Sequence, residues 1–237
     1  MRYFMKIYAV KTLEISEEKL KKICLSIDLE KRCKIEKFIN KKDKIRTLIG
    51  EILIRTIIFQ ELSVRNKYIT FEKNEYGKPY MKEHPKFNFN ISHSGDFVVC
   101  AIDDKPIGID IEKVKHIEYK DIAKSFFSAS EFDYIVKEDL NSQLNKFYEI
   151  WTLKESYIKY CGQGLSIPLK SFSIDIGQYE NIKVIIDKEY KEPVFKRFDI
   201  GSEYKMAVCS ANKEISNNII MIDQNSLINN YSRFDLE

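Results

Sequence analysis

The chain has 237 residues, enough for one large domain or two small ones. Its hydrophobic content of 44% allows a packed core, and its 32% of charged residues indicates a soluble surface. The net charge of only +3 argues against a general nucleic-acid-binding protein, and no apolar stretch is long enough to span a membrane.

Five cysteines are scattered along the chain, without a Cys-x-x-Cys pair or a nearby histidine. This spacing argues against zinc and against a disulfide framework, and it is typical of a reducing compartment. The start of the sequence lacks a signal-peptide core followed by a small-residue cleavage site. We therefore expect a cytoplasmic protein.

The first third of the chain predicts helices between short strands. In order, we expect a strand over 5–10, a helix capped by Ser16, a basic helix over 28–39, a helix over 44–62 and a strand over 68–71. Too many positions of 44–62 are apolar for a surface helix, so we place this helix in the core. A turn follows at 74–79.

The middle of the chain predicts three strands. Phe87, Phe89 and Ile91 alternate with polar residues, 97–102 is continuously apolar, and 107–112 alternates apolar with acidic residues. We expect a turn at 92–95 and an antiparallel meander of the three strands.

The last part predicts helices followed by short strands. Ser128-x-x-Glu131 is a capping box, and a helix over 144–160 should end at Cys161-Gly162-Gln163-Gly164, where a glycine cap is expected. Strands are expected at 171–176, 184–186, 194–200 and 204–209, and residues 211–237 should be peripheral. Because each half passes through helices into a small sheet, the fold class is α+β.

Three carboxylates suggest chemistry. Asp110 and Glu112 are two apart on the expected strand, so they should leave the same face. Glu155 lies on the later helix, between Lys154 and Lys159. Three acids beside lysines suit a hard divalent cation that holds a phosphate-bearing ligand.

Plainer interpretations of the same residues stay open at this point. Two acids on a strand can be a solvated face, and Glu155 with Lys159 can be an ordinary helix ion pair. The basic segment 31–46 is either an anion-binding surface or a solvated helical face.

Six motifs, taken together and in this order, carry a family resemblance. They are Tyr76-Gly77-Lys78-Pro79, Phe89-Asn90-Ile91-Ser92-His93-Ser94-Gly95, Ile107-Gly108-Ile109-Asp110-Ile111-Glu112, Phe126-Phe127-Ser128-x-x-Glu131, Trp151-x-x-Lys154-Glu155-Ser156-x-x-Lys159 and Gly162-x-Gly164-Leu165. The chain resembles the 4′-phosphopantetheinyl transferases of the longer, surfactin-synthetase-activating type. The resemblance runs from about residue 5 to about residue 210.

The resemblance implies a monomer of two pseudo-symmetric lobes, each with helices packed on a small antiparallel sheet, and a ligand cleft between them. Residues 1–105 would form the lobe on the adenine and 3′-phosphate side of coenzyme A. Residues 106–237 would form the lobe with the metal site and the pyrophosphate side. Short relatives are half-length trimers, and the length and the Asp-x-Glu pair of this chain favour the longer type.

The implied reaction moves the 4′-phosphopantetheine arm of coenzyme A onto a serine of an apo carrier protein and releases adenosine 3′,5′-bisphosphate. The carrier would be peptidyl, acyl or polyketide, and the sequence does not name it. Magnesium is the implied metal, and manganese also accepts oxygen ligands. Neither nucleic acid nor a membrane is implied as a partner.

The resemblance assigns the acids and one lysine to the reaction. Asp110, Glu112 and Glu155 match the metal-binding acids, and Lys159 matches the lysine at the pyrophosphate. Glu155 is our candidate for the base that accepts the serine proton, and a metal-bound water is an equal alternative. Lys154 would either assist Lys159 or pair with a neighbour.

The resemblance also assigns residues that bind coenzyme A. They are Lys31, Lys34 and Thr47 at the 3′-phosphate and adenine end, Lys78 in its turn with Gly77 and Pro79, and Ser92 and His93 at the phosphates. Trp151 is expected in the core. Phe126 and Phe127 are either core residues or an apolar patch for the carrier.

Two other classes of function remain. A non-catalytic module that binds coenzyme A or a nucleotide would explain the lysines but not the three acids. A nucleic-acid-binding module would use the segment 31–46, but that segment lacks interleaved aromatic residues.

Overall fold

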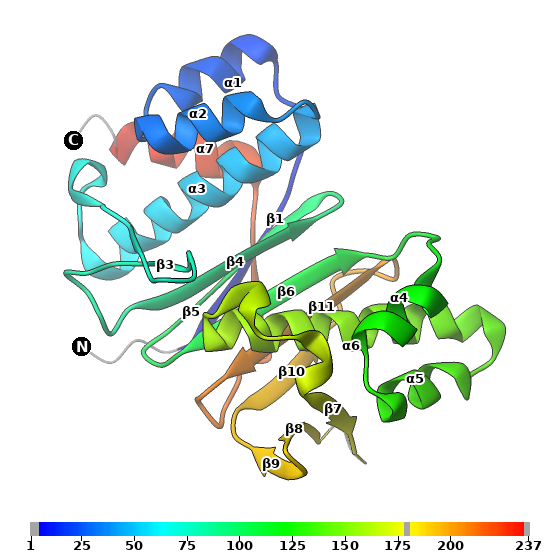
Figure 1. Ribbon diagram of the computed structural model, residues 1–237. Coiled ribbons are helices and arrows are strands. Elements are labelled where there is room, and N and C mark those ends of the chain that lie inside the picture. Colours follow the sequence, from blue (N-terminus) through cyan, green and yellow to red (C-terminus); the bar gives the residue numbers. More distant parts are fainter. Residues whose placement is uncertain (1–4, 178–180, 235–237) are drawn as a thin grey trace.

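The computed structural model describes residues 5–177 and 181–234 (Figure 1). Helices and small sheets form two lobes of mixed α and β structure, which confirms the α+β class. No helix in the described part of the chain is long and apolar enough to cross a lipid bilayer.

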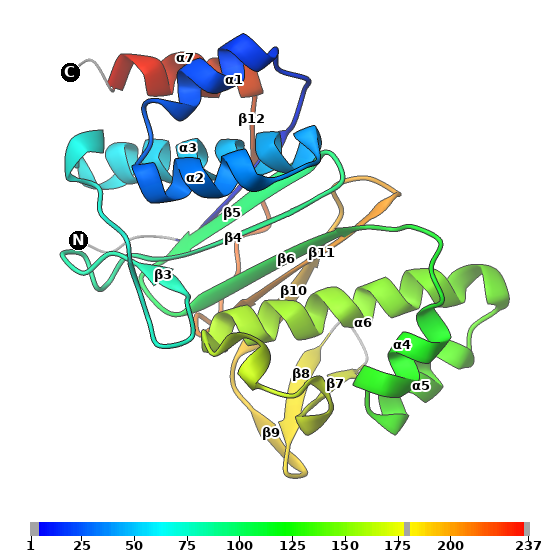
Figure 2. The ribbon, with the colours of Figure 1, turned by 45° about the horizontal axis from the view of Figure 1, so that its top comes forward.

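The first sheet has the strand order β12-β1-β5-β4. It consists of β12 (Ile219–Ile222), β1 (Lys6–Lys11), β5 (Phe97–Asp103) and β4 (Asn88–Ser94). The predicted core helix is α3 (Lys41–Leu62), and it packs its isoleucines on one face of this sheet, against residues such as Val98 and Cys100. Helices α1 (Glu17–Cys24) and α2 (Leu29–Lys37) lie over α3 (Figure 2).

The second sheet has the order β10-β11-β6, from β10 (Val194–Phe198), β11 (Tyr204–Ser210) and β6 (Ile107–Lys113). The long helix α6 (Leu140–Cys161) covers one face, where Leu153 packs on Ala207 and Cys209. Helices α4 (Tyr119–Phe126) and α5 (Ala129–Val136) flank α6, and the predicted capping box opens α5. A further small sheet holds β7 (Ser173–Ile176), β8 (Ile182–Ile186) and β9 (Glu189–Lys191).

The two sheets pack face to face. Val99 and Ala101 of β5 share one buried cluster with Ile109 and Ile111 of β6. Because α3 and α6 cover the outer faces, the layers run α3, first sheet, second sheet, α6 (Figures 1 and 2).

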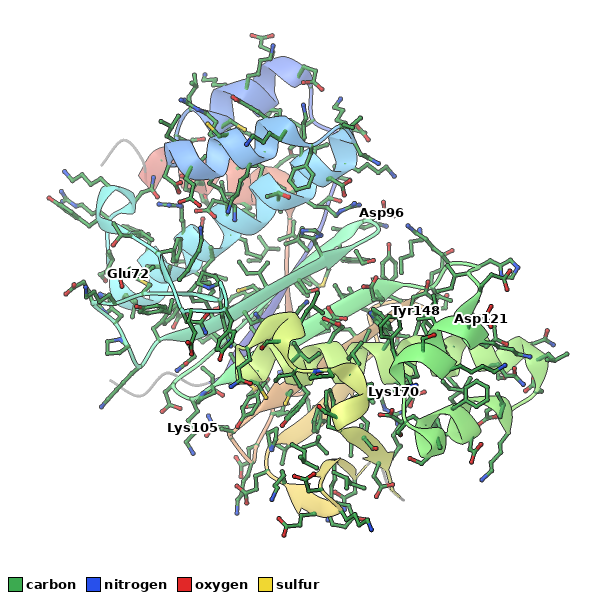
Figure 3. All side chains as sticks on the ribbon, in the orientation of Figure 1. Glu72, Asp96, Lys105, Asp121, Tyr148 and Lys170 are labelled. Carbon is green, nitrogen blue, oxygen red and sulfur yellow. The ribbon has the colours of Figure 1, made fainter. Side chains whose placement is uncertain are left out.

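The predicted meander is wrong in its third strand. β4 and β5 do form an antiparallel hairpin, whose turn lies at Gly95 and Asp96 instead of 92–95 (Figure 3). β6, however, pairs with β11. Its apolar side packs on the face of β5, so β6 belongs to the next layer and does not extend the first sheet.

Side chains of β4 connect the two sheets where their edges meet. The Ile109 N–H donates to Asn90 Oδ1 (2.8 Å), and the Lys113 N–H donates to Ser94 Oγ (3.0 Å). Side chains of β4 therefore bind the backbone of β6. The face of β6 that carries Asp110 and Glu112 consequently lies beside the edge of β4.

Two further expectations are corrected. The strand expected over 68–71 does not form: residues 66–68 form a short 3₁₀ helix, and 69–71 belong to no strand. The strands nearby are β2 (Glu72–Lys73) and β3 (Pro79–Tyr80). The C-terminal segment is not peripheral. β12 pairs with β1 in parallel, so the first sheet is mixed and not antiparallel as expected. α7 (Gln224–Phe234) buries Leu227, Ile228 and Tyr231 against the residues of α3.

This packing places residues 219–234, which we had expected in the second lobe, on the first lobe. Its physical reason is the apolar spacing of Leu227, Ile228 and Tyr231 along α7, which can be buried only against another apolar face. The division of the chain at residues 105 and 106 stays a prediction.

Gly108 sets the distance between β6 and α6. A Cβ atom at this position would lie 2.1 Å from Ser156 O and 2.4 Å from Tyr160 N, both backbone atoms of α6. We therefore expect Gly108→Ala to lower the free energy of unfolding by about 1–3 kcal/mol, because the helix must move away from the strand. Denaturant unfolding followed by circular dichroism measures this loss.

Gly50→Ala is the matched control. A Cβ atom there would lie 3.4 Å from Ile91 Cγ2, an ordinary contact, and alanine is favoured over glycine inside a helix by roughly 0.5–1 kcal/mol. This variant should be neutral or slightly more stable. Equal losses in the two variants would contradict the close approach of β6 and α6.

Candidate active site

The strand β6, the strand β4 and the helix α6 bring the predicted site residues together. Asp110 is buried on the α6 side of β6, and Glu112 lies two residues further along the same face. Ser92 comes from β4, and Glu155 and Lys159 come from one face of α6. The close approach at Gly108 allows the helix to present these side chains directly to the strand.

Asp110 is the centre of this arrangement. Its Oδ1 accepts hydrogen bonds from Lys159 Nζ (2.6 Å) and from Ser92 Oγ (2.8 Å). Lys159 Nζ also donates to Ser92 Oγ (2.9 Å). The other oxygen, Oδ2, is buried and has no hydrogen-bond partner among the described residues. An unpartnered buried carboxylate oxygen is costly, so this atom fits a site that receives a cation or a donor from a ligand.

The three carboxylates influence one another. Burial raises the pKa of Glu112 to about 7, with further contributions from the negative charges of Asp110 and Glu155, while a hydrogen bond from Ser94 Oγ (2.7 Å) opposes the shift. Burial and the Asp110 charge also raise the pKa of Glu155, and Lys159 opposes this shift. Mutual repulsion of this kind is relieved when a cation is bound.

The three carboxylates are not already arranged in the geometry of a metal site. Within residues 5–177 and 181–234, no group of three or more His, Cys, Asp and Glu side chains is arranged as a metal site. Lys159 is instead the positive charge closest to Asp110. The oxygen donors fit a hard divalent cation by their chemistry, and the unpartnered Oδ2 is the structural observation that supports it.

A cavity of about 410 Å³ collects four of the predicted coenzyme-binding residues. Lys31 and Lys34 of α2 line one side, and Gly77 and Pro79 line another. Phe89 and Ile91 supply apolar surface from β4, the strand that continues to Ser92. Lys31 Nζ lies 3.3 Å from Glu51 Oε2, and Lys34 Nζ lies 3.3 Å from Glu30 Oε1. Both ammonium groups are therefore already paired with carboxylates.

Thr47 and His93 lie outside the lining of this cavity. Within the described ranges, Thr47 Oγ1 on α3 is buried without a hydrogen-bond partner, which fits a group that contacts a ligand. His93 lies on β4 with part of its surface open to solvent. Desolvation of the rest of the ring, and then the Arg46 charge, lower the pKa of His93.

Two predicted lysines point elsewhere. Lys154 is fully buried and pairs with Glu131 at 2.7 Å, so of its two proposed roles the structure shows the pairing. Lys78 Nζ donates to the carbonyls of Lys159 and Ile107.

The aromatic residues of the motifs differ in burial. Trp151 is partly buried beside Phe127 and Phe147. Phe127 is buried, and Phe126 is exposed.

Sequence reasoning missed Asn90 and Ser94 as site residues. Asn90 holds the backbone of β6, and Ser94 donates to Glu112. The available signal was the period-two spacing of Asn90, Ser92 and Ser94, which predicts one polar face but not what that face contacts.

The raised pKa of Glu112 gives a pH prediction. Between pH about 4.5 and 7, the unfolded chain loses the Glu112 proton while the folded protein keeps it, so this group lowers stability as the pH rises through that window. Glu112→Gln removes the effect. We expect the melting temperature of the variant, relative to wild type, to rise from pH 5 to pH about 7.5 in chelator-treated protein.

Thermal unfolding at several pH values measures this difference. Glu83→Gln, at an exposed position, serves as the control and should show no comparable trend. A difference for Glu112→Gln that does not change with pH would rule out the raised pKa.

Comparisons with known proteins match both halves of the chain. A model of the 4′-phosphopantetheinyl transferase superfamily matches residues 106–209. A model of the N-terminal part of 4′-phosphopantetheinyl transferases matches residues 12–105. The chain belongs to the 4′-phosphopantetheinyl transferase family, whose members transfer phosphopantetheine from coenzyme A to carrier proteins.

Individual relatives extend over most of the chain. It is 39% identical to 4′-phosphopantetheinyl transferase Sfp of Bacillus subtilis (strain 168), over 94% of this chain and 100% of that protein. It is 42% identical to 4′-phosphopantetheinyl transferase gsp of Aneurinibacillus migulanus, over 81% of this chain and 79% of that protein. These relatives bear out the resemblance to the surfactin-synthetase-activating type.

A more distant relative is also similar. The chain is 34% identical to L-aminoadipate-semialdehyde dehydrogenase-phosphopantetheinyl transferase of Rattus norvegicus, over 77% of this chain and 66% of that protein.

Proposed function

We propose that the protein catalyses this transfer through a metal site formed by Asp110, Glu112 and Glu155, with magnesium as the cation. The reaction moves the 4′-phosphopantetheine arm to a serine of a carrier protein and leaves adenosine 3′,5′-bisphosphate. The observation that carries the proposal is Asp110, whose Oδ1 binds Lys159 while its buried Oδ2 has no partner among the described residues.

The charges of the site suit phosphoryl transfer. The attacking serine and the leaving bisphosphate both need stabilisation of negative charge, and the protein contributes mainly by positioning groups and by electrostatics. A bound magnesium ion would supply Lewis-acid neutralisation of the pyrophosphate; manganese has the same ligand preference. Lys159, which is held by Asp110 and Ser92, would offset charge on the leaving group.

The proton of the serine hydroxyl needs an acceptor. We assign this role to Glu155, whose carboxylate lies on α6 near Asp110 and Lys159, and a metal-bound water is the alternative acceptor. Glu112 is a weaker candidate, because one of its oxygens is engaged by Ser94. Glu155→Gln should therefore impair the transfer even if coenzyme A still binds.

The nucleotide end of coenzyme A would occupy the cavity that Lys31, Lys34, Gly77 and Pro79 line. The ammonium groups of Lys31 and Lys34 supply positive charge for the 3′-phosphate, and the apolar wall at Phe89 and Ile91 can face the adenine. Thr47 and His93 would contact phosphate oxygens from the neighbouring α3 and β4, because Thr47 Oγ1 lacks a partner within the described ranges.

We further propose that the protein is a cytoplasmic monomer that acts on carrier proteins without nucleic acid or a membrane. The five cysteines are free thiols, as a reducing compartment favours. The small net charge supports a protein partner over nucleic acid.

Intact-protein mass spectrometry tests the function. An apo carrier protein from a peptide synthetase and one from fatty-acid synthesis are each incubated with the protein, coenzyme A and magnesium. We expect a gain of one phosphopantetheine unit that disappears when chelator is added, and the two rates give the carrier preference. Tight coenzyme A binding without a gain on either carrier would favour the non-catalytic binding module. Steeply salt-dependent binding of nucleic acid would favour the nucleic-acid-binding module.

A further inference from the structure

Lys78 crosses from the first lobe to the elements that carry the reacting groups. Its Nζ donates to the carbonyl of Lys159 (2.6 Å) and to the carbonyl of Ile107 (3.1 Å). Lys159 belongs to α6, and Ile107 opens β6, the strand of Asp110. The ammonium group thus joins the two elements whose side chains meet at the Asp110–Lys159 ion pair.

The end of α6 needs these donors. The last carbonyls of a helix have no partner within the helix, and a positive charge near them is favourable. The loop 74–79 supplies two donors there, Lys78 Nζ to Lys159 O and Asn74 Nδ2 to Gly162 O (2.8 Å). Gly162 also leaves room for the lysine stem, since a Cβ atom there would lie 3.0 Å from Lys78 Cδ.

The loop itself is well ordered by hydrogen bonds. Asn74 Oδ1 accepts from the N–H groups of Tyr76 (3.0 Å) and Lys78 (2.8 Å), and the Asn74 N–H donates to Lys78 O (3.0 Å). Gly77 takes a φ of +88°, which other residues rarely adopt. Because these hydrogen bonds fix its backbone, the loop can hold the end of α6 in a fixed position relative to the cavity that Gly77 and Pro79 line.

The same loop lines the cavity assigned to the nucleotide. Gly77 and Pro79, the residues on either side of Lys78, belong to the lining of the 410 Å³ cavity, whereas Lys78 does not. Lys78 lines an adjoining cavity of about 330 Å³ beside Tyr160 and Cys161, and the two cavities share Pro79 and Phe89 in their linings. Burial lowers the pKa of Lys78 to about 8, as expected for an amine surrounded by protein.

We propose that the ammonium group of Lys78 is a positioning group that ties the end of α6 and the start of β6 to the coenzyme-binding loop. This proposal rests on the proposed function and adds to the coenzyme A contact that the family resemblance implied for Lys78. Without the ammonium group, the carbonyls of Lys159 and Ile107 lose a shared donor, and Lys159 is no longer held in register with Asp110.

The test separates catalysis from binding in Lys78→Met, which keeps the apolar stem and removes the charge. Calorimetry gives the Kd for coenzyme A, and carrier modification at saturating coenzyme A gives kcat. We expect kcat to fall by about 10- to 100-fold, because small misplacements of reacting groups are costly, while Kd changes by less than about threefold. Lys82→Met, at an exposed position of the same segment, should match wild type in both quantities.

A weaker Kd with an unchanged kcat at saturation would show that the ammonium group acts only in coenzyme A binding, and it would overturn the proposal. Unchanged kcat and Kd would also overturn it. If Lys78→Met does not fold, as judged by circular dichroism, the kcat and Kd of Asn74→Asp are measured in its place. Aspartate keeps the acceptor for Tyr76 and Lys78 but cannot donate to Gly162 O, so the proposal requires a lower kcat with little change in Kd.

Wild type is measured first in the same assay. If wild type binds coenzyme A but modifies neither carrier, the proposed function fails, and this result is distinct from a failure of the role assigned to Lys78.

Discussion

Asp110→Asn should reduce carrier modification by about 100-fold or more while the protein remains folded. The substitution keeps the shape of the side chain and removes its charge. Lys159 Nζ, now 2.6 Å from Asp110 Oδ1, would lose its ionic partner, and the buried Oδ2 would no longer be available as an anionic ligand. Both the proposed cation and the position of the Lys159 ammonium group depend on this one carboxylate.

The measurement is the initial rate of phosphopantetheine transfer, with circular dichroism and the melting temperature as checks on the fold. Asp133→Asn, at an exposed position of α5, is a matched control and should retain the wild-type rate. Turnover of Asp110→Asn within a few-fold of wild type would show that Asp110 is not part of the reaction site, and the proposed metal assignment would fall with it.

The second large effect is on stability. Lys154→Met should lower the free energy of unfolding by about 3–5 kcal/mol, because it leaves the buried carboxylate of Glu131 without its cation. In the folded protein both side chains are fully buried. Lys154 Nζ also donates to Phe172 O (2.7 Å), and the carboxylate of Glu131 also accepts from the N–H groups of Ser128 and Ile174.

Denaturant unfolding measures this loss, and Lys170→Met, at an exposed lysine, should show none (Figure 3). The double variant Glu131→Gln, Lys154→Met should recover part of the stability, because no unpaired charge remains. A Lys154→Met protein with wild-type stability and a strongly reduced transfer rate would instead place Lys154 at the pyrophosphate.

The local elements were predictable because their signals lie within a few residues of one another. The apolar spacing of 44–62 predicts the core helix α3, Ser128 with Glu131 predicts the start of α5, and Gly162 predicts the end of α6. The alternation in 107–112 likewise predicts that Asp110 and Glu112 share a face, and the structure places both beside Ser92 and Ser94 of β4.

The candidate site was predictable in its members and less so in their directions. The acids and Lys159 were found from motifs, and the structure brings Asp110 and Lys159 into contact. Lys78 and Lys154 belong to the same motifs, but their amines face backbone carbonyls and a buried carboxylate. A motif specifies which residue is present, whereas its partner depends on packing around it.

Local patterns in the sequence are therefore enough to predict the α+β class, most of the helices and strands, the two acids on one strand face and the family. Packing over long distances in the chain makes β6 join β11 and returns β12 and α7 to the first lobe. It also gives Lys78 and Lys154 partners that are 81 and 23 residues away. The reason is physical. Periodicity and caps are set by neighbours in the chain, but these contacts are set by which apolar faces bury one another, and many arrangements satisfy the same local pattern.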